Sequence, residues 1–217
     1  AEKWQKDLDV YKDICTYFII EGNVFDKQPL YDEDELAYLP VSLSEYLYRY
    51  LSGIGYDMIV FLNVVEGFHN KYDDESLSRF EMCAGQPCEP GKPLCEDLST
   101  GIKVLQKTDC AKAIVFEFAN TFALEADHLS EEENLNYIKL MLSCLDPVTA
   151  MGSRGNYLRN IVFLIVEKTN DVPAWFYLNN SQVKVLTVTK PEKQVRKEVI
   201  RSGLYRIEGE EDLSQNE

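Results

Sequence analysis

Five short hydrophobic runs, each bounded by turn-forming residues, recur along the chain. They are rich in Val, Ile and Phe and mostly do not alternate between apolar and polar positions, which is typical of strands buried on both faces of a parallel sheet. The runs therefore predict five strands, at residues 16–25, 57–68, 111–120, 160–169 and 183–189.

Segments with helical spacing separate these runs. SLSEYLYRYLSGIG (42–55) and SEEENLNYIKLMLSCL (130–145) each have Ser and Glu three positions apart at the start, which is the spacing of a capping box. Further helices are predicted at 97–107, 172–178 and 191–201, the last with a proline suited to a first turn. Because strands and helices alternate, we predict an α/β fold: a three-layer αβα sandwich with a mainly parallel five-stranded sheet.

Three segments fall outside this alternation. Residues 26–40 are predicted to form an acidic loop and residues 84–98 a loop rich in Pro and Cys. The tail at 206–217 is acidic and poor in apolar side chains, so we expect it to be disordered. With no linker visible in the sequence, residues 1–205 are predicted to form a single domain.

The charge of the chain narrows the range of partners. Its 37 acidic and 22 basic residues give a formal net charge of −15, which repels nucleic-acid phosphate and anionic lipid. No apolar run approaches the roughly 20 residues that span a bilayer, and the start lacks the apolar centre of a signal peptide. We therefore expect a cytoplasmic protein that binds protein partners or itself, with no direct contact to nucleic acid or membrane. The first residue, Ala1, suggests a fragment of a longer protein.

Three of the six cysteines lie close together in CAGQPCEPGKPLC, at Cys83, Cys88 and Cys95. Their spacings of four and six intervening residues are looser than those of a structural zinc motif, so the sequence favours a reduced loop. Zinc, with Cys110 or His69 as a fourth ligand, is the alternative.

The order of elements resembles the large subdomain of the AAA+ ATPases over residues 14–202. The match is sharpest in IVFLIVEKTNDVPAWFYLNNSQVKVLTVTKPEKQVRKEVI (161–200), which is similar to a sensor strand ending in Thr-Asn, a proline-containing helix, a strand and a Pro-acid-x-x-x-Arg helix. Glu117, near the end of the strand predicted at 111–120, falls at the family's metal-coordinating acidic position. The resemblance implies a P-loop-NTPase-like fold and an N-terminal module of a larger ATPase.

Three features that the resemblance leads us to expect are missing. The segment after the first strand contains Gly22 as its only glycine, and no Gly-Lys-Ser/Thr occurs in the chain, so the backbone cradle, lysine and hydroxyl of a phosphate loop are absent. Five carboxylates stand there instead: Asp26, Asp32, Glu33, Asp34 and Glu35. Phe118 replaces the glutamate that activates water, and LNNSQVKV (178–185) lacks the arginine that acts on a neighbouring subunit.

The candidate cofactor-binding residues are Glu117, Thr169 and Asn170, at the carboxyl ends of strands where open α/β folds bind ligands. No catalytic residue, metal ligand or cofactor is assigned, and ATP with magnesium is the alternative. The residue types alone favour simpler roles: Thr169 and Asn170 suit the capping of a strand before a turn, and Glu117 suits a helix cap or a lysine pair.

Other polar groups have simpler interpretations. We expect His69 and His128 on the surface, and Arg154 and Arg159 in a solvated connection rather than a phosphate nest. Tyr46, Tyr48 and Tyr50 with Leu47 and Leu51 cover a wide face of one helix, so part of this face is expected to meet a partner.

The sequence is compatible with two functions. The first is a catalytically degenerate AAA+-like domain that serves as an assembly or regulatory module of a larger ATPase. The second is a nucleotide- or small-ligand-binding domain that uses the crevice at the carboxyl end of the sheet without a phosphate loop.

Overall fold

A computed structural model of the chain describes residues 2–191, 193 and 195–201. Contacts between Cα atoms divide the chain into two compact units. One unit comprises the described residues up to Val24 together with Tyr48–Val188, and the other comprises Phe25–Leu47 with the described residues from Thr189 onward. The single domain over 1–205 stays a prediction, and the predicted tail at 206–217 lies outside the described residues.

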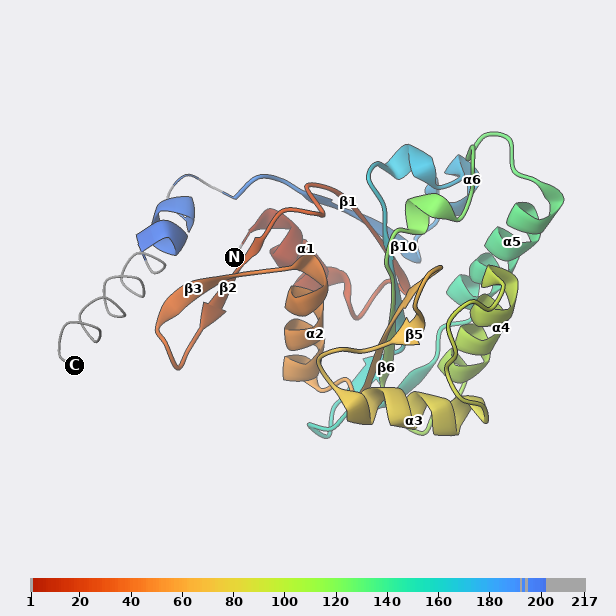
Figure 1. Cartoon of the computed structure of the whole chain (residues 1–217), viewed down its shortest axis with the longest axis horizontal. Coiled ribbons are helices and arrows are strands. Elements are labelled where there is room, and N and C mark those ends of the chain that lie inside the picture. Colours follow the sequence, from red (N-terminus) through yellow and green to blue (C-terminus); the bar gives the residue numbers. More distant parts are fainter. Residues whose placement is uncertain (1, 192, 194, 202–217) are drawn as a thin grey trace. The chain divides into compact units, whose positions relative to one another are not determined.

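The first unit is built on a six-stranded sheet with the strand order β10-β1-β9-β6-β4-β5 (Figure 1). Neighbours among five of the strands pair in parallel: β1 (Tyr17–Gly22), β4 (Met58–Asn63), β6 (Lys112–Phe116), β9 (Ile161–Ile165) and β10 (Val183–Val188). Each of the five predicted runs thus contributes a parallel strand and the mainly parallel sheet is confirmed, but the sheet has six strands rather than the predicted five. Every residue of β4, β6 and β9 is buried, which explains why their sequences are apolar apart from Asn63 and Lys112 at two strand ends.

The run predicted as one strand at 57–68 is instead a hairpin. After β4 the chain turns at residues 64–66 and returns as β5 (Gly67–His69), antiparallel to β4. The side-chain oxygen of Asn63 accepts hydrogen bonds from the backbone N–H groups of Val65 and Glu66, at 3.0 and 2.9 Å. Asn63 therefore makes the turn inside a run whose apolar composition gave no sign of it.

Helices cover both faces of this sheet. One face packs on α3 (Asp74–Ala84), α4 (Leu94–Leu105), α5 (Glu131–Leu145) and α6 (Ala174–Tyr177) through a single hydrophobic cluster that includes Ile19, Val60, Phe80, Leu98, Ile114, Leu140, Leu164 and Phe176. On the other face Phe18 and Phe163 stack with ring centroids 5.3 Å apart. Figure 1 shows α1 (Lys3–Tyr11) on the side of the sheet away from α4 and α5, so the three-layer αβα sandwich is confirmed.

Capping explains where two helices begin. The Ser130 hydroxyl accepts a hydrogen bond from the backbone N–H of Glu133, and the Glu133 carboxylate accepts one from the backbone N–H of Ser130, which confirms the predicted capping box of α5. In α2 (Leu43–Ile54) the Ser42 hydroxyl accepts from the Glu45 N–H at 3.1 Å.

Several elements differ from the sequence-based expectation. Helices α1 and α3 were not predicted, and α4 begins at Leu94, inside the segment predicted as a loop at 84–98. The connection that contains Arg154 and Arg159 carries a small antiparallel hairpin, β7 (Thr149–Met151) with β8 (Tyr157–Arg159). Single turns of 3-10 helix, η1 (Ala119–Thr121) and η2 (Thr169–Asp171), follow β6 and β9.

The second unit contains a hairpin of β2 (Gln28–Asp32) and β3 (Ala37–Val41), so the prediction of an acidic loop at 26–40 was wrong. The acidic residues form its turn, because the Asp32 carboxylate accepts hydrogen bonds from the backbone N–H groups of Asp34 and Glu35. Residues 193 and 195–201 are helical, within the helix predicted at 191–201. Across the described residues, each helix falls short of the length and apolarity needed to cross a membrane.

Candidate functional site

The carboxyl ends of the parallel strands meet at one edge of the sheet. Ligands of open α/β folds bind there, at the point where the chain leaves neighbouring strands in opposite directions. In this sheet that point lies between β1 and β9. From β1 the chain continues to β4, on the β9 side of the sheet, whereas from β9 it continues to β10, on the β1 side.

Glu21 occupies this point. One carboxylate oxygen accepts hydrogen bonds from Thr169, from its backbone N–H at 2.6 Å and from its hydroxyl, and the other accepts from the Thr187 hydroxyl at 3.0 Å. Burial alone would raise the pKa of Glu21, but the hydrogen bonds from Thr169 and Thr187 outweigh it and lower the pKa below its ordinary value of 4.5. The switch point of the sheet therefore holds an ionised carboxylate of the protein itself.

Gly22, the one glycine in the segment where a phosphate loop is expected, packs against the neighbouring strand. Its φ is +95°, and a Cβ at this position would lie 2.5 Å from the carbonyl oxygen of Val188. The backbone N–H of Asn23 donates to that same oxygen at 2.9 Å. Gly22 is thus required for contact with β10 and does not form part of a backbone cradle for phosphate.

A second polar group lies at the ends of β4, β5 and β6. Parallel pairing of Leu62 with Phe116 places the residues that follow, Asn63 and Glu117, side by side. The Asn63 side-chain N–H groups donate to Glu66 Oε2 at 2.7 Å and to Glu117 Oε2 at 3.2 Å. His69 Nε2 lies 3.3 and 3.5 Å from those same two oxygens.

His69 is held toward these carboxylates by the hairpin. Its Nδ1 lies 2.9 Å from the carbonyl oxygen of Gly67. Burial lowers the pKa of His69, but the hydrogen bonds with Glu117 and the Gly67 carbonyl and the negative charges of Glu117 and Glu66 outweigh that effect, so the pKa is raised above its ordinary value. The expectation of a surface histidine was wrong for His69, whose side chain is 21% exposed, and is confirmed for His128, at 82%.

The structure places the three candidate cofactor-binding residues at the same sheet edge but in different contacts. Glu117 belongs to the group with Asn63 and His69, whereas Thr169 binds Glu21. Asn170 is exposed in η2. Their role in cofactor binding stays a prediction.

Other residues named from the sequence have contacts within the protein. Arg159 donates to the side chain of Gln182 at 2.9 Å. Tyr48 stacks on Tyr72 with centroids 5.3 Å apart, and Tyr50 donates to Asp9 at 3.0 Å. The tyrosine-rich face of α2 is therefore engaged within the chain at these two positions.

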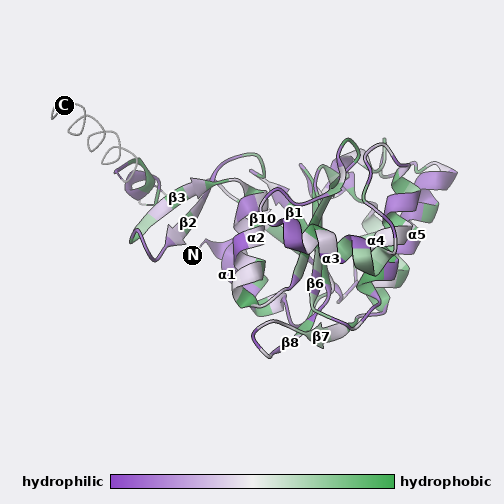
Figure 2. Cartoon of the chain, turned by 60° about the horizontal axis from the view of Figure 1, so that its bottom comes forward, coloured by the Kyte–Doolittle hydropathy of each residue, from purple (hydrophilic) through white to green (hydrophobic). Residues whose placement is uncertain are grey.

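The sequence-based reasoning missed an apolar stripe on α5. Leu135, Ile138, Leu142 and Leu145 are exposed, whereas Tyr137, Leu140 and Cys144 of the same helix are buried against the sheet. The exposed residues follow a 3-4-3 spacing, which places them within one stripe of a helix. Figure 2 shows α5 carrying both hydrophilic and hydrophobic residues at the periphery of the sheet. The spacing is visible in the sequence, but a buried and an exposed stripe on one helix cannot be told apart there.

Cys83, Cys88 and Cys95 do not form a metal site in the structure. Among the described residues, the one group of three or more His, Cys, Asp or Glu ligand atoms that converge within 4.8 Å is Glu66, His69 and Glu117. Burial raises the pKa of the Cys88 thiol to about 11, which keeps it protonated at neutral pH.

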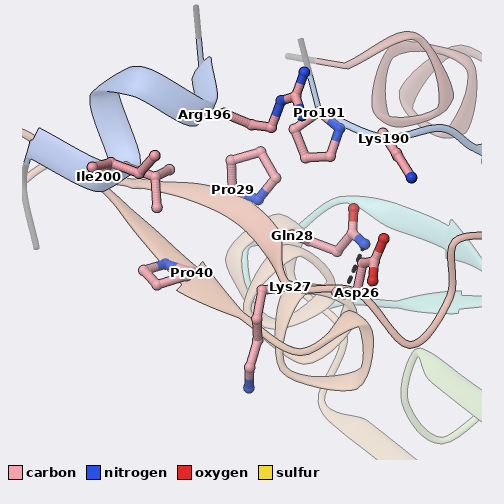
Figure 3. Close-up of a pocket in the computed structure, with 10 residues that line it drawn as sticks. Asp26, Lys27, Gln28, Pro29, Pro40, Lys190, Pro191, Arg196 and Ile200 are labelled. Atoms are coloured by element: carbon pink, nitrogen blue, oxygen red, sulfur yellow. Dashed lines mark hydrogen bonds between the residues drawn. The ribbon is translucent and has the colours of Figure 1, made fainter. Parts of the chain in front are cut away.

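The second unit contains a groove of about 460 Å³ (Figure 3). Its lining combines proline and aliphatic residues with charged and polar ones: Asp26, Lys27, Gln28, Pro29, Pro40, Lys190, Pro191, Arg196, Val199 and Ile200. The side chain of Gln28 donates to the carbonyl oxygen of Asp26 at 3.0 Å beside it. This groove contains none of the residues proposed from the sequence to bind a cofactor.

Comparison with known proteins agrees with the element order and the sheet. Residues 9–189 match the family described as AAA+ chaperone, N-terminal Rossmann-like domain. Neither the curated proteins nor the solved structures gave a match. The family match covers most of the chain, and this chain therefore belongs to the family of AAA+ chaperone N-terminal Rossmann-like domains, as an N-terminal module of an AAA+ ATPase.

Proposed function

We propose that this domain is a catalytically degenerate AAA+-like module that serves the assembly or regulation of a larger ATPase rather than ATP hydrolysis. The observation that carries the proposal is the Glu21 carboxylate at the switch point of the sheet, hydrogen-bonded to Thr169 and Thr187. A nucleotide phosphate in this position would meet a like charge.

Binding of a phosphate beside Glu21 would carry two energetic costs. Glu21 is ionised at neutral pH because its pKa is lowered, and two like charges about 4 Å apart repel by roughly 4 kcal/mol at an effective dielectric constant of 20. Admitting a phosphate also requires that Glu21 give up its hydrogen bonds, and each such bond to a charged group contributes about 1.5–3 kcal/mol. The chain offers no Gly-Lys-Ser/Thr loop that would offset these costs.

The exposed stripe of α5 supports a role in protein contacts. Leu135, Ile138, Leu142 and Leu145 present apolar side chains to solvent over about three turns of one helix. A contiguous apolar surface of this kind marks protein–protein contact sites. We infer that copies of the domain associate through α5, in keeping with the expected self-association.

We also place the protein in the cytoplasm. All six cysteines are free, among them Cys83, Cys88 and Cys95, which lie close in sequence. Such usage is typical of a reducing compartment.

Thermal unfolding with and without magnesium nucleotide tests the loss of nucleotide binding. We expect no change in melting temperature with millimolar MgATP or MgADP. A bound ligand at about 100 times its Kd would add roughly 2.7 kcal/mol of stability, so a clear upward shift would contradict the proposal.

Sedimentation velocity over a range of protein concentrations tests the assembly role. We expect concentration-dependent association of the wild type and its loss in Leu142→Lys. The control is Val10→Lys, which places the same charge at an exposed apolar position of α1. A protein that stays monomeric at every concentration, or equal association of both variants and the wild type, would rule out self-association through α5.

The second candidate function is binding of a nucleotide or small ligand at the sheet edge without a phosphate loop. The polar group of Asn63, Glu66, His69 and Glu117 favours it, because its side chains converge at the carboxyl ends of the strands. In this candidate Glu117, Thr169 and Asn170 contact the ligand. The same thermal measurement separates the two functions, since only this one predicts stabilisation by nucleotide, with loss of the shift in Glu117→Gln.

A further inference from the structure

The geometry of Glu66, His69 and Glu117 fits a metal ion. An ion with tetrahedral ligands and bonds of about 2.0–2.2 Å places neighbouring ligand atoms about 3.3–3.6 Å apart. His69 Nε2 lies 3.3 Å from Glu66 Oε2 and 3.5 Å from Glu117 Oε2. All three ligand atoms lie within 4.8 Å of one another. The two distances from His69 Nε2 thus already match the separations that such an ion imposes.

The surrounding hydrogen bonds orient each ligand as metal sites require. A metal-binding histidine donates its other ring N–H to a carbonyl or carboxylate, which fixes the tautomer. His69 Nδ1 lies 2.9 Å from the Gly67 carbonyl oxygen, and donation of its N–H to that oxygen leaves the Nε2 lone pair directed at the two glutamates. The side chain of Asn63 donates to both glutamate oxygens, at 2.7 and 3.2 Å, and so holds the two carboxylates together.

The three residues come from two segments that the fold fixes, the hairpin of β4 with β5 and the end of β6. Glu66 lies in the turn made by Asn63, His69 ends β5, and Glu117 directly follows β6. The N–H of Glu117 donates to the carbonyl oxygen of Leu62 at 2.8 Å, which keeps the end of β6 in register with β4. Binding therefore requires little ordering of these side chains, and preorganisation of this kind increases affinity.

We propose that Glu66, His69 and Glu117 bind one divalent transition-metal ion of the Zn²⁺ type, with a coordination position left open to water. One imidazole with two carboxylates suits zinc, which takes nitrogen and oxygen ligands, and three protein ligands with an open position are typical of its non-structural sites. The site lies apart from the Glu21–Thr169 contact, so the proposal goes beyond the proposed function and stands or falls separately from it.

A simpler arrangement uses the same residues without metal: a protonated His69 between two carboxylates. The chain carries a related pair elsewhere, because His128 Nδ1 lies 3.5 Å from Glu125 Oε2 on an exposed segment. Among the residues that the structure describes, no third ligand atom converges on that pair. His128 is therefore a matched control for metal binding that needs the full set of three ligands.

Isothermal titration of the 217-residue chain with Zn²⁺, in the presence of millimolar Mg²⁺, tests the proposal. We expect one ion per chain, binding weakened at least tenfold in His69→Ala and in Glu66→Gln, and wild-type binding in His128→Ala. Glu66 is exposed, so Glu66→Gln separates loss of a ligand from loss of the fold.

Co²⁺ absorption identifies the ligands, because the six cysteines are an alternative source of metal binding. We expect d–d bands without thiolate charge-transfer absorption, and their loss in His69→Ala. Any of three results overturns the proposal: no Zn²⁺ binding by the wild type, binding unchanged in both ligand variants, or thiolate absorption from the bound Co²⁺.

Discussion

The carboxylate of Glu21 accepts hydrogen bonds from both the backbone N–H and the hydroxyl of Thr169, so one side chain joins the ends of β1 and β9. Thr169 is the residue for which the resemblance to AAA+ ATPases implies a position at the end of a sensor strand. Its backbone N–H and hydroxyl donate to a residue of the same chain, and the contact joins the ends of two neighbouring strands.

Removing this contact will destabilise the domain. We expect Glu21→Gln and Thr169→Val each to lower the free energy of unfolding by about 1–2 kcal/mol, because a hydrogen bond to a charged group is lost. The double variant will lose less than the sum, since both changes remove the same interaction. Urea unfolding of the four proteins measures this coupling, and strict additivity would show that the two side chains do not interact.

The same contact predicts how stability depends on pH. The pKa of Glu21 is lower in the folded protein than its ordinary 4.5, so the unfolded chain takes up a proton first as the pH falls. The stabilisation is fully present above about pH 4.5 and is lost as the pH falls through the folded pKa. Urea unfolding from pH 7 to pH 3 will show a smaller loss of stability in Glu21→Gln than in the wild type. Equal losses would contradict the assigned pKa shift.

The central strands β4, β6 and β9 were predictable because all their residues are buried, which selects an almost unbroken apolar run. Helix α3 was missed although its start and end are encoded: Asp73 accepts from the N–H groups of Glu75 and Ser76, and Gly85 ends the helix with a positive φ. Few large apolar residues of α3 face the core, Phe80 and Leu77 among them, so its hydrophobic period is weak.

The site was less predictable than the fold. Glu117 was recognised from the family resemblance of the strand predicted at 111–120, but its neighbours Glu66 and His69 come from a hairpin that the sequence analysis did not predict. Their convergence depends on the register of β4 with β6 and on the turn at Asn63. Glu21 was missed because a single polar residue at the end of an apolar strand has no local signature of its partner.

Alanine substitutions at three glycines distinguish the cost of a positive φ from the cost of a steric clash. Gly22→Ala meets the Val188 carbonyl oxygen at 2.5 Å in addition to a positive φ, so we expect a loss of more than about 2 kcal/mol. Gly85→Ala has a positive φ but open space, and about 1–2 kcal/mol is expected. Gly53→Ala, in α2 with open space, will stabilise by up to about 0.5–1 kcal/mol. Chemical denaturation of the three variants measures these changes in the free energy of unfolding. Equal losses in Gly22→Ala and Gly85→Ala would mean that β10 moves aside to make room for the methyl group.

Truncation of two leucines of α5 that lie two positions apart will lower the stability of the domain by very different amounts. Leu140 is completely buried in the cluster beneath the sheet, so Leu140→Ala leaves a cavity and will cost about 2–5 kcal/mol. Leu142 is 65% exposed, so Leu142→Ala will change the stability of the dilute protein by less than about 0.5 kcal/mol. Self-association at high concentration will respond differently. Leu142→Ala will weaken it directly, whereas Leu140→Ala will affect it only through loss of folded protein. A dilute protein destabilised equally by both changes would show that the Leu142 side chain packs within its own domain, and α5 would then lack a free apolar stripe.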